Sequence, residues 1–231
     1  MAAVTRVSVP WGVLYWQPPP VAAVGESISE RTLDEHDVGN EPLSPLVRWL
    51  NEATEAGELL PNAMALATSS ADGAPAVRMV LLDRLDERGC VFQTNVESPK
   101  AYDLASHPRA GLALFWPHLL RQVRVTGPVT RLSVEEVQRL FDATPAGIQA
   151  MLRACRQSRV IANREDLEQR YAAAVLEAAA GERPPMPSDW GGFRVGLETV
   201  EFWQGRPNRL QDRLRFSRNA DGAWRLERLM P

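Results

Sequence analysis

The segment EFWQGRPNRLQDR, from Glu201 to Arg213, combines side chains that a plain hairpin does not need. Two aromatic residues stand beside the turn-prone sequence GRPN, and two arginines, Arg209 and Arg213, then flank a glutamine and an aspartate. A hairpin tip requires neither a tryptophan nor two arginines spaced four apart. The segment therefore raises the question of which ligand it holds.

Two further cations stand where they could bind an anion. Arg78 lies in the middle of the apolar strand sequence AVRMVLLD, where an arginine either faces solvent, which is the commoner case, or points at an anion. Lys100 follows Ser98 and Pro99 at the start of a predicted short helix. Unpaired N–H groups at a helix N-terminus attract phosphate and a lysine adds a positive charge, although most such lysines are simply solvated.

Three polar residues could read the edge of a heteroaromatic ring. Gln122 opens a predicted strand, and Gln157 and Ser158 lie in the polar run CRQSR. For each of them alone, capping of a loop is the commoner role. The sequence contains neither GxGxxG nor GxxxxGK[ST], which argues against a Rossmann or P-loop nucleotide site.

Composition narrows the class of protein. The chain has 231 residues, 45% of them hydrophobic, with a net charge of −3 and a pI of about 5.7, so no general nucleic-acid or membrane partner is indicated. The two cysteines, Cys90 and Cys155, lack the spacing of a zinc site or a disulfide framework. No metal ligand set is expected, no apolar run reaches membrane-spanning length, and a cytoplasmic location is predicted.

The pattern of apolar residues predicts a mainly β protein with helices, of the α+β class. Residues 1–40 are Pro-rich, then acidic, and are expected to form a mobile or extended arm. A helix capped by Ser44 follows, and residues 63–95 are predicted to form three consecutive antiparallel strands. Further segments are predicted as follows: a short helix at 98–108, strands at 110–116 and 121–132, helices near 133–143 and 164–182, and three more strands after residue 190. About eight antiparallel strands around a few helices indicate a closed or split β-barrel forming one domain, 41–231.

Six motifs in order resemble the pyridoxamine 5′-phosphate oxidase family. They are RMVLLD, FQTNVESPKA, RQVRVTG, CRQSR, WGGFRV and EFWQGRPNRLQDR, and together they span about Glu41 to Pro231. Members of that family are FMN-dependent homodimers with an antiparallel split barrel. The resemblance implies the same fold, the same cofactor and a flavin site at the interface between two copies.

Carried over position by position, the resemblance implies a set of cofactor-binding residues. Arg78 and Lys100 match the residues that bind the FMN phosphate. The other matching positions are Met79, Val80 and Leu81 on the same strand, Gln93 and Thr94, Gln122, Gln157 and Ser158, some of which reach across the dimer interface, and Trp203 and Arg213, which flank the flavin ring. Arg209 is expected to orient the substrate, and Gln211 stands where the family has a histidine.

The departures from the family concern the substrate. Asp83 replaces a family lysine, and positions that grip the substrate phosphate read Leu140, Thr144 and Ile148. One acidic and three uncharged residues attract a phosphate dianion weakly. The sequence therefore predicts an FMN-dependent oxidase, reoxidised by dioxygen, for a small metabolite without a phosphate, such as those of the related phenazine-biosynthesis oxidases. A pyridoxine or pyridoxamine 5′-phosphate oxidase with a rebuilt pocket, and a flavin-binding protein without turnover, remain alternatives.

Overall fold

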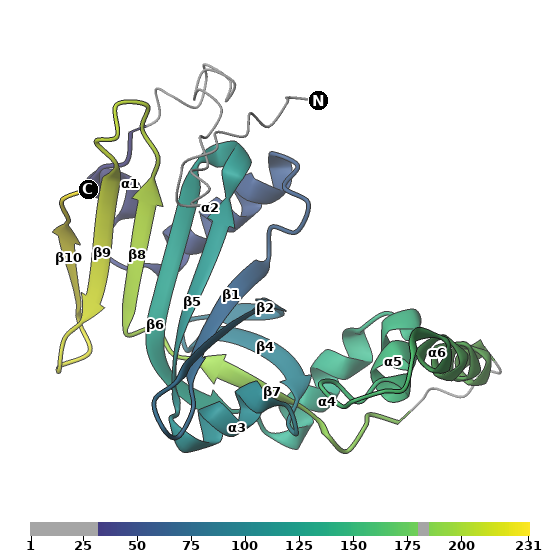
Figure 1. Cartoon of the computed structure of the whole chain (residues 1–231). Helices are drawn as coiled ribbons and strands as arrows, with labels where there is room; N and C mark the ends of the chain where they lie inside the picture. Colours follow the sequence, from purple (N-terminus) through teal and green to yellow (C-terminus); the bar gives the residue numbers. More distant parts are fainter. Residues whose placement is uncertain (1–31, 180–184) are drawn as a thin grey trace, which may run out of the picture.

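The computed structural model describes residues 32–179 and 185–231 (Figure 1). Its helices are α1 (Glu35–Val38), α2 (Leu43–Glu55), α3 (Pro99–Ser106), the 3-10 turn η2 (Pro117–Leu119), α4 (Val134–Ala143), α5 (Ala146–Ala154) and α6 (Arg164–Ala179). Its strands are β1 (Ala63–Ser69), β2 (Pro75–Leu81), β3 (Arg84–Asp86), β4 (Gly89–Asn95), β5 (Arg109–Trp116), β6 (Arg121–Arg131), β7 (Trp190–Val195), β8 (Thr199–Gln204), β9 (Asp212–Arg218) and β10 (Trp224–Arg228).

The described strands form an antiparallel barrel that is split into two parts. The main sheet runs in the order β10-β9-β8-β6-β5-β1-β2, while β4 pairs with β3 and β7 (Figure 1). Strand β6 belongs to both parts, because residues 121–126 pair with β8 and residues 129–131 pair with β7. The prediction of an antiparallel split barrel with helices is confirmed.

Gly127 lies where β6 passes from one part to the other. A Cβ atom at this position would lie 1.9 Å from the carbonyl oxygen of Gly196, in the connection between β7 and β8. Only glycine allows two backbones to approach so closely. The sequence motif RVTGP thus fixes the point at which the barrel splits.

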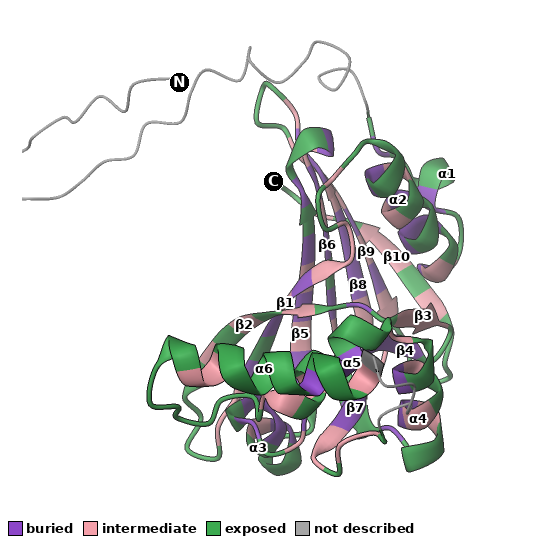
Figure 2. Ribbon diagram, turned by 90° about the vertical axis from the view of Figure 1, so that its right-hand side faces the viewer, coloured by how far each residue is buried: buried purple, intermediate pink, exposed green. Residues whose placement is uncertain are grey.

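Helix α2 packs on the inner face of the main sheet and supplies much of the core. Leu46, Trp49 and Ala53 are buried, as their helical spacing predicts. The Trp49 ring meets the Phe202 ring edge-on, with centroids 5.1 Å apart, a favourable aromatic geometry. Figure 2 shows buried residues along β6 and β8 and on α2. The outer face of the same strands is therefore left for other partners.

Three elements differ from the prediction. The predicted meander over residues 63–95 is wrong, because the chain leaves the main sheet after β2, and β4 pairs with the short β3 and with β7. The predicted strand GGFRVGLETVEFW is two strands, β7 and β8, which are separated by residues 196–198. Helix α5 precedes the CRQSR run and packs against α6.

The beginning of the described chain also differs. Residues 1–31 of the predicted arm lie outside the described residues, but α1 is a short helix closed by reciprocal hydrogen bonds between Asp34 and Asp37. Leu33 and Val38 are buried in the core, so an extended arm is wrong for this part. Ser44 does not cap α2. The Glu41 carboxylate instead accepts hydrogen bonds from the backbone N–H groups of Leu43 and Ser44.

Candidate functional site

Lys100 lies at the centre of a buried polar cluster at the start of α3. Its Nζ donates hydrogen bonds to Thr94 Oγ1 at 2.9 Å, Ser98 Oγ at 3.0 Å and Gln157 Oε1 at 2.9 Å. Among the described residues no carboxylate forms an ion pair with this ammonium. Burial, and then the neighbouring Arg78 charge, lower the pKa of Lys100 to about 8. A buried cation surrounded by neutral oxygens is suited to an incoming anion.

Arg78 lies beside this cluster, on the inner face of the edge strand β2. Its Nη1 donates to Thr68 Oγ1, and its Nη2 lies 3.6 Å from Asp103 Oδ2. Thr68 also donates to Asp103, at 2.6 Å, so the single carboxylate is shared between a hydroxyl and a guanidinium. The side chain is 23% exposed, which leaves part of the guanidinium open to a ligand. Arg78 therefore does not follow the solvent-facing alternative.

The loop after α5 closes over the cluster from the same chain. Thr94 Oγ1 donates to Gln157 Oε1 at 2.8 Å, so the Gln157 amide oxygen accepts from both Thr94 and Lys100. Ser158 adopts a left-handed backbone with φ of 70°, and Arg159 forms an ion pair with Glu97 at 2.8 Å. Gln157 thus belongs to the Lys100 cluster of its own chain.

A second group of predicted residues lies in one row across three strands. Gln122 on β6 faces Trp203 on β8, and Trp203 faces Arg213 on β9. All three are half-buried, whereas their neighbours Val123, Phe202 and Leu214 are fully buried on the other face. The row therefore lies on the outer face of the sheet.

Arg213 is held in place by Glu201. Its Nε and Nη2 lie 2.9 and 2.8 Å from Glu201 Oε1, and its Nη1 donates to the carbonyl oxygen of Met230. Glu201 is only 8% exposed and also lies 3.5 Å from Arg124. This pairing holds the guanidinium of Arg213, which is the cross-strand partner of Trp203.

The two groups cannot meet within one chain. Arg78 is on the inner face of β2, while the row of Gln122, Trp203 and Arg213 is on the outer face of the sheet. In addition, β1 and β5 separate β2 from β6, which places these strands about 14 Å apart at the usual strand spacing. A ligand that touches both groups therefore needs two copies of the chain.

The remaining predicted cofactor residues lie on the edge strand β2 and on β4. Met79 and Leu81 point outward and are 64% and 48% exposed, while Val80 packs against the core. Gln93 accepts a hydrogen bond from the Trp190 indole at 3.0 Å. Because Gln93 and Thr94 are adjacent in a strand, they face opposite sides, and only Thr94 reaches Lys100.

Arg209 and Gln211 lie in the connection between β8 and β9. Arg209 is exposed and has a left-handed backbone with φ of 61°. Within the described chain its guanidinium makes no hydrogen bond or ion pair. Gln211 is half-buried, and its Oε1 accepts from the backbone N–H of Arg206 at 2.7 Å.

Four positions depart from the family and carry no positive charge: Asp83, Leu140, Thr144 and Ile148. Asp83 Oδ2 accepts from the backbone N–H of Gln93 at 2.8 Å. Loss of solvation raises the pKa of Asp83, and this hydrogen bond partly offsets the rise. Leu140 packs against a small apolar cluster, the Thr144 hydroxyl donates to the Leu140 carbonyl, and Ile148 is 47% exposed.

Sequence reasoning missed two members of the Lys100 and Arg78 cluster. Thr68 and Asp103 contact Arg78, but one lies in an ordinary strand and the other in an ordinary helix, and no local signal marks either. Ser98 was noted only as a neighbour of Lys100, yet it is fully buried and bonds to it. A hydroxyl just before a helix that begins with proline and lysine is the signal that could have identified it.

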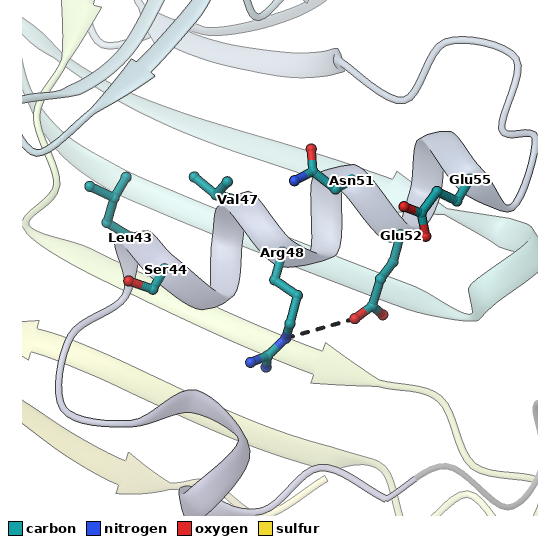
Figure 3. Close-up of a pocket in the computed structure, with 7 residues that line it drawn as sticks. All are labelled: Leu43, Ser44, Val47, Arg48, Asn51, Glu52 and Glu55. Atoms are coloured by element: carbon teal, nitrogen blue, oxygen red, sulfur yellow. Dashed lines mark ion pairs between the residues drawn. The ribbon is translucent and has the colours of Figure 1, made fainter.

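A hollow along α2, in the described part of the chain, contains none of the predicted site residues. A depression of about 620 Å³ follows the exposed side of α2, where Arg48 and Glu52 form an ion pair at 3.7 Å (Figure 3). Its other lining residues are Leu43, Ser44, Val47, Asn51 and Glu55. Residues 32–179 and 185–231 contain no cluster of metal-binding side chains, and none of their helices could cross a membrane. The predicted cofactor residues thus lie outside this depression.

Comparison with known proteins covers nearly the whole described chain. Residues 50–176 match the family described as pyridoxamine 5′-phosphate oxidase, and residues 190–231 match the pyridoxine 5′-phosphate oxidase C-terminal dimerisation region. The chain is 45% identical over 205 residues to a pyridoxine/pyridoxamine 5′-phosphate oxidase of Burkholderia orbicola, covering 88% of this chain and 95% of the relative. It is 46% identical over 200 residues to the Cupriavidus necator enzyme of the same name, covering 87% and 93%.

Solved structures agree with these sequence matches. PhzG from Burkholderia lata 383, in complex with tetrahydrophenazine-1-carboxylic acid, superposes with a TM-score of 0.81 at 31% identity, covering 88% of this chain and all of PhzG. An FMN-binding protein from Nostoc punctiforme shares the fold, with a TM-score of 0.65 at 17% identity, covering 81% and 96%. The chain therefore belongs to the pyridoxamine 5′-phosphate oxidase family.

Proposed function

We propose that the chain is an FMN-dependent oxidase that works as a homodimer. The observation that carries the proposal is the buried Lys100 ammonium, which has three neutral oxygen partners and the second cation, Arg78, beside it. A phosphate group at this place would gain charge-assisted hydrogen bonds from both side chains and favourable interaction with the start of α3. The residues present therefore fit the phosphate end of FMN.

The row of Gln122, Trp203 and Arg213 suits the ring end of the cofactor. Trp203 offers an aromatic face, Gln122 can both donate and accept hydrogen bonds, and Arg213 is held rigidly by Glu201. Because this row and Arg78 lie on opposite faces, we infer that each FMN is held by Arg78, Thr94, Lys100 and Gln157 of one copy and by the row of the other. The match of residues 190–231 to a dimerisation region supports this arrangement.

FMN, when bound, would supply the two-electron chemistry, accepting a hydride at N5 from the substrate and returning the electrons to dioxygen. The chain's own residues bind and orient. Arg209, exposed and free of partners in the described chain, would orient an anionic or electron-rich group of the substrate. No acid–base dyad stands out in the sequence, which fits a reaction whose chemistry the cofactor supplies.

We further propose that the substrate carries no phosphate and is a carboxylated or aromatic metabolite, oxidised in the cytoplasm. Asp83, Leu140, Thr144 and Ile148 offer one carboxylate and three uncharged side chains where the family grips a phosphate. The Asp83 carboxylate has no cationic partner among the described residues and would repel a dianion. The binding of tetrahydrophenazine-1-carboxylic acid by PhzG supports this substrate class.

A combined ligand and oxygen-uptake experiment tests the proposal. Mass spectrometry of the purified native protein is expected to detect FMN. An oxygen electrode should then record uptake with a non-phosphorylated aromatic donor and little with pyridoxine 5′-phosphate. Efficient uptake with pyridoxine 5′-phosphate would favour the vitamin B6 oxidase that the curated relatives are named for. FMN that no donor reduces would favour a flavin-binding protein without turnover.

A further inference from the structure

The β8–β9 connection, Gly205–Gln211, presents Arg209 in a strained conformation. The φ of 61° lies in the left-handed region, which is unfavourable for a residue with a Cβ atom. Such a conformation persists only where surrounding contacts hold it. The Arg209 guanidinium supplies none of these contacts within the described chain, so they must come from elsewhere in the loop.

Gln211 supplies the hold through a short chain of hydrogen bonds. Its Oε1 accepts from the Arg206 N–H at 2.7 Å, and the Arg206 carbonyl in turn accepts from the Arg209 N–H at 3.1 Å. The Asn208 carboxamide adds a bond from the Leu210 N–H at 3.0 Å. The Gln211 side chain therefore fastens the end of the loop to its beginning, and Arg209 lies between them.

We propose that Gln211 is a positioning residue, which holds Arg209 in its left-handed conformation and does not itself contact the substrate. Its Oε1 is engaged by the loop, whereas the Arg209 guanidinium is exposed and is taken as the group that meets the substrate. This inference rests on the proposed function only in taking Arg209 as the group that meets the substrate. The hold itself is a property of the loop and can be tested without a substrate.

The rate of tryptic cleavage after Arg209, in the FMN-loaded full-length protein, measures how firmly Gln211 fixes the loop. We expect trypsin to cut the Arg209–Leu210 bond faster when the loop opens, whereas the Arg206–Pro207 bond resists trypsin. Gln211→Met keeps the side-chain length without the acceptor and should speed cleavage about fivefold, which corresponds to the loss of one hydrogen bond. Gln211→Glu keeps an acceptor of the same reach and should restore the wild-type rate. Cleavage after Arg170 in α6 serves as the control and should not change.

A ligand titration tests the link from Gln211 to Arg209. Benzoate, a small aromatic carboxylate, is titrated into FMN-loaded protein while the flavin absorbance is followed. Gln211→Met should weaken benzoate about fivefold in the wild-type background and have no effect in an Arg209→Ala background.

The two assays separate two kinds of failure. Unchanged tryptic rates in Gln211→Met would overturn the positioning role. A benzoate effect of Gln211→Met that persists without Arg209 would also overturn it, because Gln211 would then act on the ligand directly. No benzoate response in the wild type, together with fivefold faster cleavage in Gln211→Met, would support the hold and count against the proposed substrate class.

Discussion

Lys100 Nζ donates a hydrogen bond of 2.9 Å to Gln157 Oε1, which joins the start of α3 to the loop that follows α5. Thr94 donates to the same oxygen, at 2.8 Å. The amide oxygen and the ammonium thus lie together at the start of α3. Thr94 and Lys100 are close in sequence and Gln157 is distant, and we propose that the FMN phosphate binds where the three converge.

Loss of either cation should weaken FMN binding. Arg78→Ala and Lys100→Ala each remove a charge-assisted phosphate contact of about 1.5–3 kcal/mol, so the affinity should fall roughly ten- to a hundredfold. Quenching of flavin fluorescence during titration of the apoprotein gives the affinity. Arg109→Ala is a matched control, since Arg109 is an exposed strand arginine paired with Glu198. Wild-type affinity in both cluster variants would exclude this phosphate site.

FMN affinity should also depend on pH through Lys100, whose pKa is lowered to about 8 in the free protein. Below pH 8 the ammonium is charged and binds phosphate, and binding in turn raises its pKa. Above pH 8 the free protein must take up a proton on binding, so affinity should fall by up to about tenfold per pH unit. Below about pH 6 the phosphate itself gains a proton, so affinity should peak between these values.

Two comparisons isolate the Lys100 contribution in this pH profile. Riboflavin, which has no phosphate, should bind without the decline above pH 8. Lys100→Arg keeps its charge at all these pH values, so its FMN affinity should not decline above pH 8. A decline of equal slope for riboflavin and FMN would mean that another group titrates.

The sequence singled out several residues that the structure brings together, whereas it predicted the pairing of strands less well; the binding of FMN by these residues stays a prediction. Arg78, Thr94, Lys100 and Gln157 converge in one cluster because the family motifs keep their order and spacing. Thr68 and Asp103 escaped notice because strand pairing and helix packing, and not a local pattern, bring them to Arg78.

Short elements explain the errors in the predicted fold. Strand β3 has only three residues, too few for an alternating pattern to show, and the predicted strand AVRMVLLD ends just before it. The break at Gly196 within GGFRVGLETVEFW leaves the alternation of residues almost intact, which concealed the change from β7 to β8. Helix α1 is four residues long, too short for helical periodicity to show.

Complementation between two defective chains should reveal a site built from two copies. One chain carries Arg78→Ala and Lys100→Ala, and the other carries Trp203→Ala and Arg213→Ala. In a mixed dimer one site combines all four substitutions, while the other has none of them. We expect co-expressed, tandem-tagged mixed dimers to bind one FMN per dimer with wild-type affinity, whereas dimers of either chain alone bind weakly.

The assembly itself has a simple measurement. Light scattering of the wild-type protein should give about twice the 25.7 kDa chain mass. A monomer loaded with FMN would contradict the two-copy site. Mixed dimers that bind no FMN with wild-type affinity would show that the cations and the ring-binding row act within one chain.

The affinity for a negatively charged substrate should depend on Asp83. Its carboxylate accepts a hydrogen bond from the Gln93 backbone N–H, and the pKa of Asp83 is raised by loss of solvation. Asp83→Lys replaces repulsion of a phosphate dianion by attraction and should lower the KM for pyridoxine 5′-phosphate by roughly tenfold or more. Asp83→Asn is the control, because it removes the charge and keeps an acceptor for Gln93. It should give a smaller gain, and equal gains in the two variants would show that only repulsion matters.

A wild-type kcat/KM for pyridoxine 5′-phosphate of about 10⁴ M⁻¹s⁻¹ or more would place the protein among ordinary enzymes for that substrate and refute the non-phosphorylated substrate class. No change of KM in Asp83→Lys would mean that the side chain faces away from the substrate.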